Sequence, residues 1–230
     1  MAGNLNIAPL REPLQQGLRA LGCHPGSEAE AEAVTERLLA YLDLISRWNR
    51  VYNLTAVRDP QDMLTQHLLD SLSVVQPLAE ALAGQTGEAA NRVLDVGSGA
   101  GLPGVVISIL RPELTVVCVD AVAKKARFIQ QVATELGLRR LHAQHTRIED
   151  LDTPPFGVVT SRAFASLVDF VMLTRRQLAP RGLWMAMKGR APDEELAALP
   201  PDVIVTGVQP LQVPGLDAQR CLVWMRLAAA

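Results

Sequence analysis

The sequence holds little cysteine and no long hydrophobic run. Its three cysteines, Cys23, Cys118 and Cys221, are widely spaced and form no CxxC or CxxxH pair. We therefore expect neither a disulfide framework nor a metal site. The same cysteine usage predicts a cytoplasmic protein. No stretch of about 18 apolar residues occurs, which predicts that no transmembrane helix is present. Residues 1–10 lack a basic segment followed by a long apolar one, so the sequence predicts no secretory signal.

Basic residues are not in excess either, since the formal net charge is −2 over 230 residues. This balance excludes a strongly cationic nucleic-acid binder but allows a local basic face. The charge is uneven along the chain. Residues 1–91 carry 6 Arg, no Lys and 11 Asp or Glu, a net charge of −5, whereas residues 92–230 carry 16 Lys or Arg and 13 Asp or Glu, a net charge of +3. We expect an acidic helical front followed by a mildly basic remainder.

Helical periodicity dominates the first part of the chain. Apolar residues recur at helical spacing over residues 28–48 and over residues 60–82, and a polar linker follows. The pattern predicts three segments: an N-terminal arm that is a short helix or loosely ordered (1–27), a helical extension (28–91) and a third segment (92–230).

Strand and helix patterns alternate from Arg92 onward. The expected strands cover residues 93–96, 114–120, 141–145, 158–159, 183–187, 203–208 and 221–227. One expected helix follows the first strand and its turn and ends near Leu110. The others cover residues 124–136, 165–178 and 192–198. Such alternation is typical of an α/β fold with a parallel sheet covered on both faces. The last two strands have no helix between them, so we expect an antiparallel pair at one edge of the sheet.

A glycine-rich turn follows the first expected strand. Asp95 lies two residues before Gly97, and Gly99 and Gly101 follow at alternate positions. Glycines there allow a tight turn and let a ligand lie against bare backbone. The dinucleotide fingerprint G-x-G-x-x-G would need glycine where the sequence has Leu102. Asp95 is a poor neighbour for a pyrophosphate and a good one for an ammonium group or for ordering the loop. The turn therefore favours S-adenosylmethionine over a nicotinamide dinucleotide, and a plain strand–helix turn is the weaker alternative.

Two later positions extend this predicted cofactor site. Asp120 lies 23 residues after Gly97, at the end of the next strand, where a carboxylate accepts hydrogen bonds from ribose hydroxyls in a doubly wound fold. Taken alone, an Asp at a strand end is more often a helix cap, and the glycine turn is what favours the cofactor role of Asp120. Ile148 and Glu149 follow the third strand, where an adenine would be recognised, although Glu149 also fits an ordinary surface acid.

Several longer segments carry a resemblance to a known family. They are Arg47-Trp48-Asn49-Arg50-Val51-Tyr52-Asn53-Leu54-Thr55, His67-Leu68-Leu69-Asp70-Ser71-Leu72, the glycine turn extended by Leu102-Pro103-Gly104, Ser161-Arg162-Ala163-Phe164-Ala165, and Met187-Lys188-Gly189. On these segments the chain, from about residue 28 to its end, resembles the bacterial 16S rRNA guanine-N7 methyltransferases called RsmG or GidB, glucose-inhibited division protein B.

The resemblance implies a Rossmann-like, class I S-adenosylmethionine-dependent methyltransferase. Its sheet would have seven strands, mostly parallel, with an antiparallel last strand, and a helical N-terminal extension would precede it. The target would be N7 of the guanine at rRNA position 527, in the decoding-region loop of the small subunit. Carried over by position, the cofactor contacts would include Gly97, Leu102, Ile148, Glu149 and Arg162. Ala121 and Thr146 stand where many relatives have Ser, which affects only fine cofactor contacts.

Methyl transfer to guanine N7 needs alignment more than a general base, because this nitrogen carries a free lone pair at neutral pH. Two cations at strand ends are the candidate catalytic residues. Arg162 suits phosphates and guanine O6, and Lys188 suits a phosphate. A surface cation or a salt bridge is the alternative role for each.

A basic stretch and several residues of the helical front are further candidates. The stretch offers possible contacts to rRNA phosphates from Lys124, Lys125, Arg127, Arg139, Arg140 and Arg147. A solvated helix and loop is the alternative. We expect Trp48 and Tyr52 in the core and His67 in a structural role. Asn53 and Asp70 are expected to support the cofactor pocket or the target loop.

The expected partner is 16S rRNA in the small ribosomal subunit, bound by a monomer. A non-catalytic ribosome-assembly protein that keeps the pocket is one alternative, and the joint presence of the glycines, Asp120, Arg162 and Lys188 disfavours it. A nicotinamide-dependent oxidoreductase is a second, disfavoured by Leu102. A methyltransferase with a small-molecule substrate is a third, and the basic stretch and the front helices favour rRNA over it.

Overall fold

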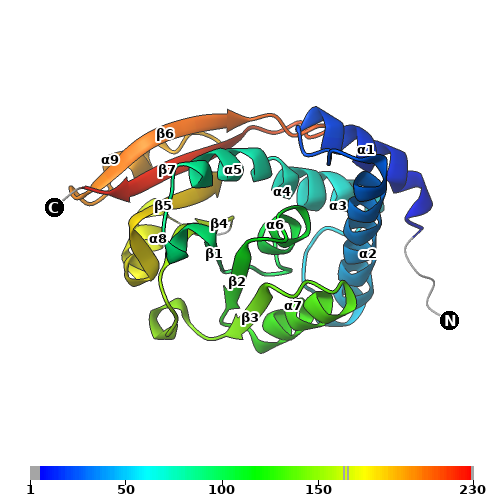
Figure 1. Cartoon of the computed structure of the whole chain (residues 1–230), viewed down its shortest axis with the longest axis horizontal. Helices are drawn as coiled ribbons and strands as arrows, with labels where there is room; N and C mark the ends of the chain where they lie inside the picture. The colour runs from blue at the N-terminus through cyan, green and yellow to red at the C-terminus, as the bar shows by residue number, and fades with distance from the viewer. Residues whose placement is uncertain (1–5, 163, 165, 229–230) are drawn as a thin grey trace.

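Seven strands form one sheet in the computed structural model, which describes residues 6–162, 164 and 166–228 (Figure 1). The strands are β1 (Arg92–Val96), β2 (Thr115–Asp120), β3 (Leu141–His145), β4 (Phe156–Ser161), β5 (Leu178–Lys188), β6 (Val203–Leu211) and β7 (Arg220–Leu227). Their order across the sheet is β3-β2-β1-β4-β5-β7-β6. Strands β1 to β5 run parallel, and β7 is antiparallel to both β5 and β6. The predicted sheet, with its antiparallel last strand, is confirmed.

Strand β4 is longer than its apolar pattern predicted. The sequence indicated only residues 158–159, but the strand continues to Ser161 and every one of its residues is buried. Polar residues fit there because their hydroxyl groups find acceptors: Thr160 donates to the Met185 carbonyl at 2.8 Å, and Ser161 donates to the Val96 carbonyl at 2.9 Å. Burying a hydroxyl group that has a hydrogen-bond partner costs little free energy. The polar end of the strand therefore stays within the sheet up to Ser161.

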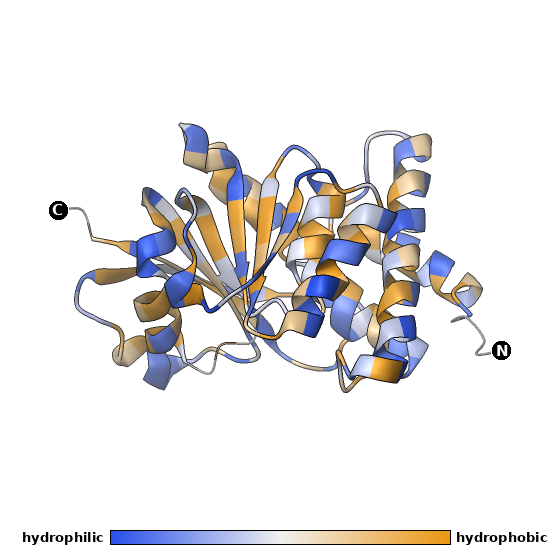
Figure 2. Cartoon of the chain, turned by 90° about the horizontal axis from the view of Figure 1, so that it is seen from below, coloured by the Kyte–Doolittle hydropathy of each residue, from blue (hydrophilic) through white to orange (hydrophobic). Residues whose placement is uncertain are grey.

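Helices cover both faces of the sheet. After β1 the helical elements are α6 (Gly104–Leu110), α7 (Ala123–Glu135), η4 (Ile148–Asp150), α8 (Leu167–Thr174), η5 (Arg175–Gln177) and α9 (Asp193–Ala197). Alternate strand residues enter two cores: Val93 and Val116 pack on the side of α6 and α7, whereas Leu94 and Val117 pack on the side of α8. Figure 2 shows the hydrophobic residues concentrated on the strands between these layers. This alternation is the period of two that a strand imposes.

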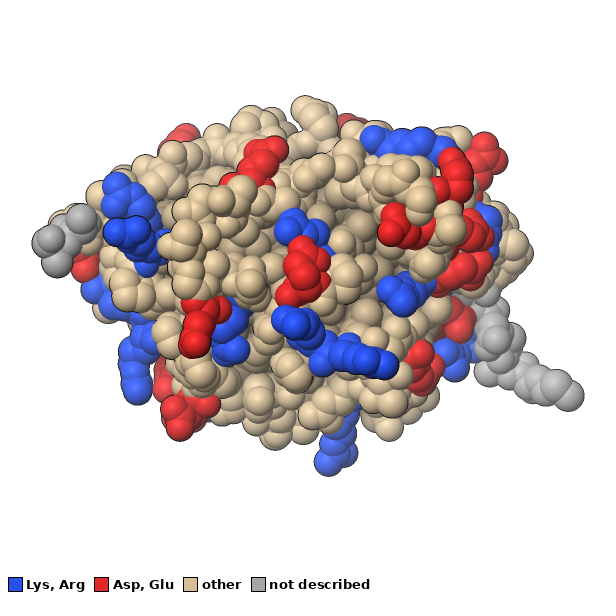
Figure 3. All heavy atoms as spheres, viewed as in Figure 1, with Lys and Arg blue, Asp and Glu red and all other residues tan. Residues whose placement is uncertain are grey.

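The chain before β1 is helical and belongs to the first of these cores. Its elements are η1 (Ala8–Leu10), α1 (Arg11–Ala20), α2 (Glu28–Tyr52), α3 (Pro60–Met63), the π-helical η2 (Leu64–Leu69), α4 (Asp70–Leu72), α5 (Val75–Ala83) and η3 (Glu88–Asn91). Leu14, Leu38 and Leu68 are fully buried among them. Figure 3 shows acidic side chains over the side of the molecule formed by α1 and α2. Residues 1–5 of the predicted arm lie outside the described residues, and the division into three segments stays a prediction.

The prediction of one continuous helix over residues 60–82 is wrong. The chain is helical from Pro60 to Leu72, turns at Ser73 and Val74, and starts again with α5. Pro77 explains the break, because it has no N–H to donate to the Ser73 carbonyl one turn earlier. With the break, Pro77 falls in the first turn of α5, where no such bond is needed.

The cysteines, the helix lengths and the start of α8 bear on three expectations from the sequence. Cys23, Cys118 and Cys221 are all buried and carry free thiols. Within residues 6–228, apart from the undescribed positions, no helix has both the length and the apolar character required to cross a bilayer. The helix expected from residue 165 begins at Leu167, with the Ser166 hydroxyl accepting from the Asp169 N–H at 3.0 Å; Ala165 lies outside the described residues.

Candidate active site

The glycine turn lies at the carboxyl end of β1, and all three of its glycines adopt positive φ. The angles are 67° at Gly97, 61° at Gly99 and 90° at Gly101, in a region that glycine enters without the cost a Cβ imposes. A Cβ on Gly101 would lie 2.5 Å from the Val105 side chain, so this glycine is needed for packing. A Cβ on Gly97 would meet nothing within 4 Å, so that face of the turn is open.

Asp95 is buried beneath the turn and orders it. One carboxylate oxygen accepts a hydrogen bond from the Gly104 N–H at 2.9 Å, at the start of α6. Complete burial raises the pKa of Asp95 to about 7. Of the two roles that the sequence left open for Asp95, this contact is the loop-ordering one. Leu102 is also buried, and its N–H donates to the Ser98 carbonyl at 3.0 Å. Cofactor contacts by Asp95, Gly99, Gly101 and Leu102 stay predictions.

The turn is also fastened by β2 and by α2. The Asp120 carboxylate accepts from the Gly99 N–H at 3.0 Å and from the Val122 N–H at 2.9 Å, and Lys125 lies 3.6 Å away. From the opposite side, the buried Tyr41 hydroxyl donates to the Ala100 carbonyl at 2.6 Å. Tyr41 lies within the helix expected over residues 28–48, and its contact across 59 positions leaves no local signal in the sequence.

A cavity of about 290 Å³ opens beside this turn and brings together four residues that the sequence singled out for the cofactor: Gly97, Asp120, Ile148 and Glu149. Its remaining lining residues are Val96, Val119, Ala121, Thr146, Arg147 and Phe164. The parallel strands explain the gathering, since the carboxyl ends of β1, β2 and β3 meet at one edge. We call this the turn cavity.

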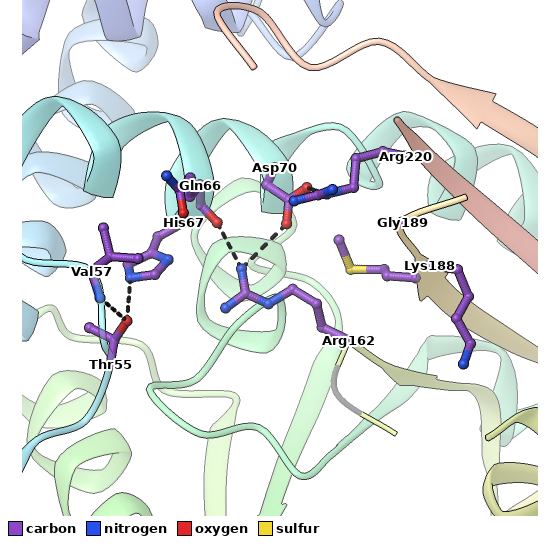
Figure 4. A pocket seen from close by; sticks show the side chains of 10 residues that line it. Thr55, Val57, Gln66, His67, Asp70, Arg162, Lys188, Gly189 and Arg220 are labelled. Atoms are coloured by element: carbon purple, nitrogen blue, oxygen red, sulfur yellow. Dashed lines mark hydrogen bonds and ion pairs between the residues drawn. The ribbon is translucent and has the colours of Figure 1, made fainter. Parts of the chain in front are cut away.

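A second, more polar cavity of about 440 Å³ lies at the carboxyl ends of β4 and β5 (Figure 4). It is lined by Thr55, Val57, Gln66, His67, Asp70, Arg162, Met187, Lys188, Gly189 and Arg220. We call it the arginine cavity. Arg162 lines this cavity, and Phe164, two residues later, lines the turn cavity. Two residues just after β4 therefore line different cavities; Ala163, between them in the sequence, lies outside the described residues.

Asp70 is the centre of the arginine cavity. Its carboxylate, with a side chain only 3% exposed, accepts from Arg162 Nη1 at 3.3 Å and from Arg220 Nε at 2.8 Å. Arg162 Nη1 also donates to the Gln66 carbonyl at 2.9 Å. That carbonyl belongs to the π-helical segment η2, a type of distortion common at functional sites. Sequence reasoning missed Arg220, whose only signal is a cation at the first position of the last strand.

Lys188 and His67 have partners that bear on their expected roles. The Lys188 ammonium lies 2.8 Å from Glu195 of α9, and Figure 4 shows its side chain directed away from Arg162. Its role in holding a phosphate stays a prediction. His67 Nε2 lies 3.0 Å from the Thr55 hydroxyl. Burial, and then the charge of Arg162, lowers the pKa of His67 to about 4, so the ring is neutral at pH 7.

The remaining candidates of the helical front lie outside both cavities. Trp48 packs in the first core, with its ring 5.4 Å from that of Phe128, as expected. The expectation of a core position for Tyr52 is wrong: it is 42% exposed, because α2 ends there and projects beyond the core. Asn53 closes α2 in the left-handed conformation and accepts from Arg58 at 3.1 Å, which is a helix-ending role.

The basic stretch is divided between opposite edges of the sheet. Lys124, Lys125 and Arg127 lie on α7 and Arg147 lines the turn cavity, so these four are near the carboxyl ends of the strands. Arg139 and Arg140 precede β3 and lie at the amino edge, where Arg140 donates to the Glu113 carbonyl at 3.1 Å. The basic residues between 124 and 147 therefore do not form one continuous face, because strand β3 and helix α7 separate them to opposite edges of the sheet. Contacts with rRNA by any of these residues stay a prediction.

The comparisons with known proteins agree with this architecture. The family model described as rRNA small subunit methyltransferase G, GidB, matches residues 34–223. The protein named ribosomal RNA small subunit methyltransferase G from Leptothrix cholodnii is 58% identical, over 96% of this chain and 97% of that protein. The protein of the same name from Methylibium petroleiphilum is also 58% identical, over 96% of this chain and 98% of that protein.

Two solved structures share the fold. A SAM-dependent methyltransferase from Aquifex aeolicus has a TM-score of 0.55 at 17% identity, covering 75% of this chain and 96% of its own. TrmN from Thermus thermophilus has a TM-score of 0.54 at 18% identity, covering 71% of this chain and 53% of its own. Such low identities show the fold alone, whereas the family model and the relatives extend over nearly the whole chain. This chain therefore belongs to the rRNA small subunit methyltransferase G family, GidB, as its motifs predicted.

Proposed function

We propose that this protein methylates N7 of the guanine at position 527 of 16S rRNA, in the decoding-region loop of the small ribosomal subunit, with S-adenosylmethionine as methyl donor. Family membership is the observation that carries the proposal, because the matched residues 34–223 include the lining of both cavities. The protein acts as a cytoplasmic monomer on its ribosomal substrate.

The turn cavity has the chemistry that S-adenosylmethionine requires. Val96, Ile148 and Phe164 give an apolar wall for an adenine ring, and Asp120 supplies a carboxylate for ribose hydroxyls. The open face of Gly97 leaves bare backbone for the amino-acid end. When bound, S-adenosylmethionine supplies a methyl group on a positively charged sulfur.

The residues of the chain are suited to orienting a nucleophile that needs no deprotonation. Guanine N7 attacks through its lone pair, so the protein's main task is alignment of the two reactants. Arg162 is well placed for this task, since it lines the arginine cavity two residues before Phe164 of the turn cavity and is fixed by Gln66 and Asp70. Its guanidinium fork suits guanine O6 or a neighbouring phosphate.

The proposal is tested by methyl transfer from labelled S-adenosylmethionine to purified small subunits that lack the modification. Free 16S rRNA and guanosine monophosphate serve as comparison substrates. We expect label in the 16S rRNA of the subunits. Label in the mononucleotide but not in subunits would support a small-molecule methyltransferase instead. Normal cofactor binding without transfer to any substrate would support the non-catalytic assembly protein.

A further inference from the structure

The arginine cavity contains a second guanidinium group, that of Arg220, whose position follows from the topology of the sheet. Strand β7 runs antiparallel to β5, and Lys188 at the end of β5 pairs with Cys221. Arg220, one residue earlier, therefore lies at the same edge as the carboxyl ends of the parallel strands. Figure 4 shows Arg220 and Arg162 reaching Asp70 from different directions. One carboxylate thus fixes two guanidinium groups that are 58 positions apart in the sequence.

The charges of this cluster do not balance. Asp70 provides one negative charge against the two permanent positive charges of Arg162 and Arg220. Both arginine side chains line the cavity and keep about a quarter of their surface exposed, 28% for Arg162 and 26% for Arg220. His67 is neutral and Lys188 is offset by Glu195, so neither removes the excess. An anion that enters the cavity meets net positive charge from two guanidinium groups.

The recess continues past Arg220. A further cavity of about 680 Å³ shares Gly189 and Arg220 with the arginine cavity and is bordered by Arg190 and by the loop between β6 and β7. A ligand held at Arg220 therefore has room to extend along the edge of the sheet in both directions. This continuity suits a chain of nucleotides better than a small anion.

We propose that Arg220, together with Arg162, binds a phosphodiester of the RNA strand next to the target guanosine, and that Asp70 is the positioning residue for both guanidinium groups. The inference rests on the proposed function. Guanidinium groups bind phosphate oxygens through paired hydrogen bonds, which fix the orientation of the strand as well as its distance. The strand would then pass from the arginine cavity toward Gly189 and Arg190.

The test compares Arg220→Ala with Arg226→Ala, which removes the same charge from the exposed far end of the same strand. We expect Arg220→Ala to raise the KM for small subunits about tenfold, the loss of one charge-assisted contact. The salt dependence of subunit binding should fall by about one unit of slope, as for one lost phosphate contact. The affinity for S-adenosylmethionine should stay within about twofold of wild type in both variants, because Arg220 lies outside the turn cavity.

Two further variants separate binding from structure. Arg220→Lys retains the positive charge, so its KM should lie between those of wild type and Arg220→Ala. If Arg220 had only a structural role, retaining the charge would not bring the KM back toward wild type. Asp70→Asn should lower kcat as well as raise the KM, because Arg162 loses the same anchor. Equal KM and salt slope for Arg220→Ala and Arg226→Ala would overturn the inference, and so would a main effect on cofactor affinity. If wild type modifies subunits in that case, the proposed function stands and only the inference fails.

Discussion

The two cavities differ in how the chain builds them. The turn cavity is made from consecutive strand ends between Val96 and Phe164, with backbone and apolar groups as its main surface. The arginine cavity collects residues between Thr55 and Arg220. It is rich in charge, because one acid and three cations are among the described residues that line it. The first is suited to one small ligand of fixed shape. The second is suited to a polyanion. The lining therefore changes from mainly apolar to mainly charged between the two cavities.

The largest effect on the rate of methyl transfer is expected from substitution of Arg162. If Arg162 aligns the target as proposed, Arg162→Ala should lower kcat by about 10²- to 10³-fold, because its guanidinium fork is lost. Arg162→Lys should recover only part of this rate, since an ammonium group cannot form paired hydrogen bonds. Single-turnover kinetics at saturating small subunits measure the effect. A defect that disappears at high subunit concentration would make Arg162 a binding residue only.

A glycine pair tests whether the turn cavity holds the cofactor. Gly97 and Gly137 have similar positive φ, 67° and 65°, and neither has an atom within 4 Å of an added Cβ. Gly97→Val and Gly137→Val should each lose about 1–3 kcal/mol of stability from backbone strain. Only Gly97→Val should lower the affinity for S-adenosylmethionine, by about 10- to 100-fold, because its side chain enters the cavity. Calorimetry that finds equal affinities would remove this turn from the cofactor site.

The buried carboxyl under the turn predicts a pH dependence of stability. The pKa of Asp95 is about 7 in the folded protein, above its usual value of 3.8, so the folded state binds more protons between these values. The contribution of Asp95 to stability is therefore full below pH 3.8 and is lost as the pH rises through 7. Relative to Asp95→Asn, the wild type should lose on the order of 4 kcal/mol between pH 4 and pH 8, about 1.4 kcal/mol for each unit of pKa shift. Urea titrations at several pH values measure this difference, and a constant difference would contradict it.

A tyrosine pair measures how far α2 supports the turn. Tyr41→Phe leaves the Ala100 carbonyl without its donor and should cost about 1–3 kcal/mol of unfolding free energy. It should also weaken cofactor binding a few-fold, since the carbonyl lies within the turn. Tyr52→Phe removes an exposed hydroxyl and should change stability by less than about 0.5 kcal/mol. Equal stabilities of the two variants in urea would mean that the Tyr41 contact is not what holds the turn.

The smallest effect is expected on the outer surface. Lys124→Ala should raise the KM for small subunits about two- to threefold and reduce its salt dependence, as one exposed phosphate contact would. Arg226→Ala, which removes an exposed charge at the far end of β7, is the matched control and should change neither quantity. A larger effect from Arg226→Ala would place the rRNA at the amino edge of the sheet and contradict the location of both cavities.

The sequence singled out residues of both cavities, but it predicted which of them lie together only for the turn cavity. Gly97, Asp120 and Ile148 follow successive parallel strands, so their gathering is a consequence of strand order that a local pattern reveals. The contact between Asp70 and Arg220 joins residues 150 positions apart, and it depends on the break before α5 and on the antiparallel direction of β7. Neither Pro77 nor the pairing of Lys188 with Glu195 stood out in the sequence, because their effect depends on tertiary neighbours.

The most direct measurement is mass mapping of 16S rRNA from cells with and without this protein, with the methylated atom identified. We expect one methyl group at N7 of the guanine at position 527, present only when the protein is present, restored by wild type and not by Arg162→Ala. An unchanged methylation pattern, or a methyl group lost from another nucleotide or from an exocyclic nitrogen, would contradict the proposed chemistry.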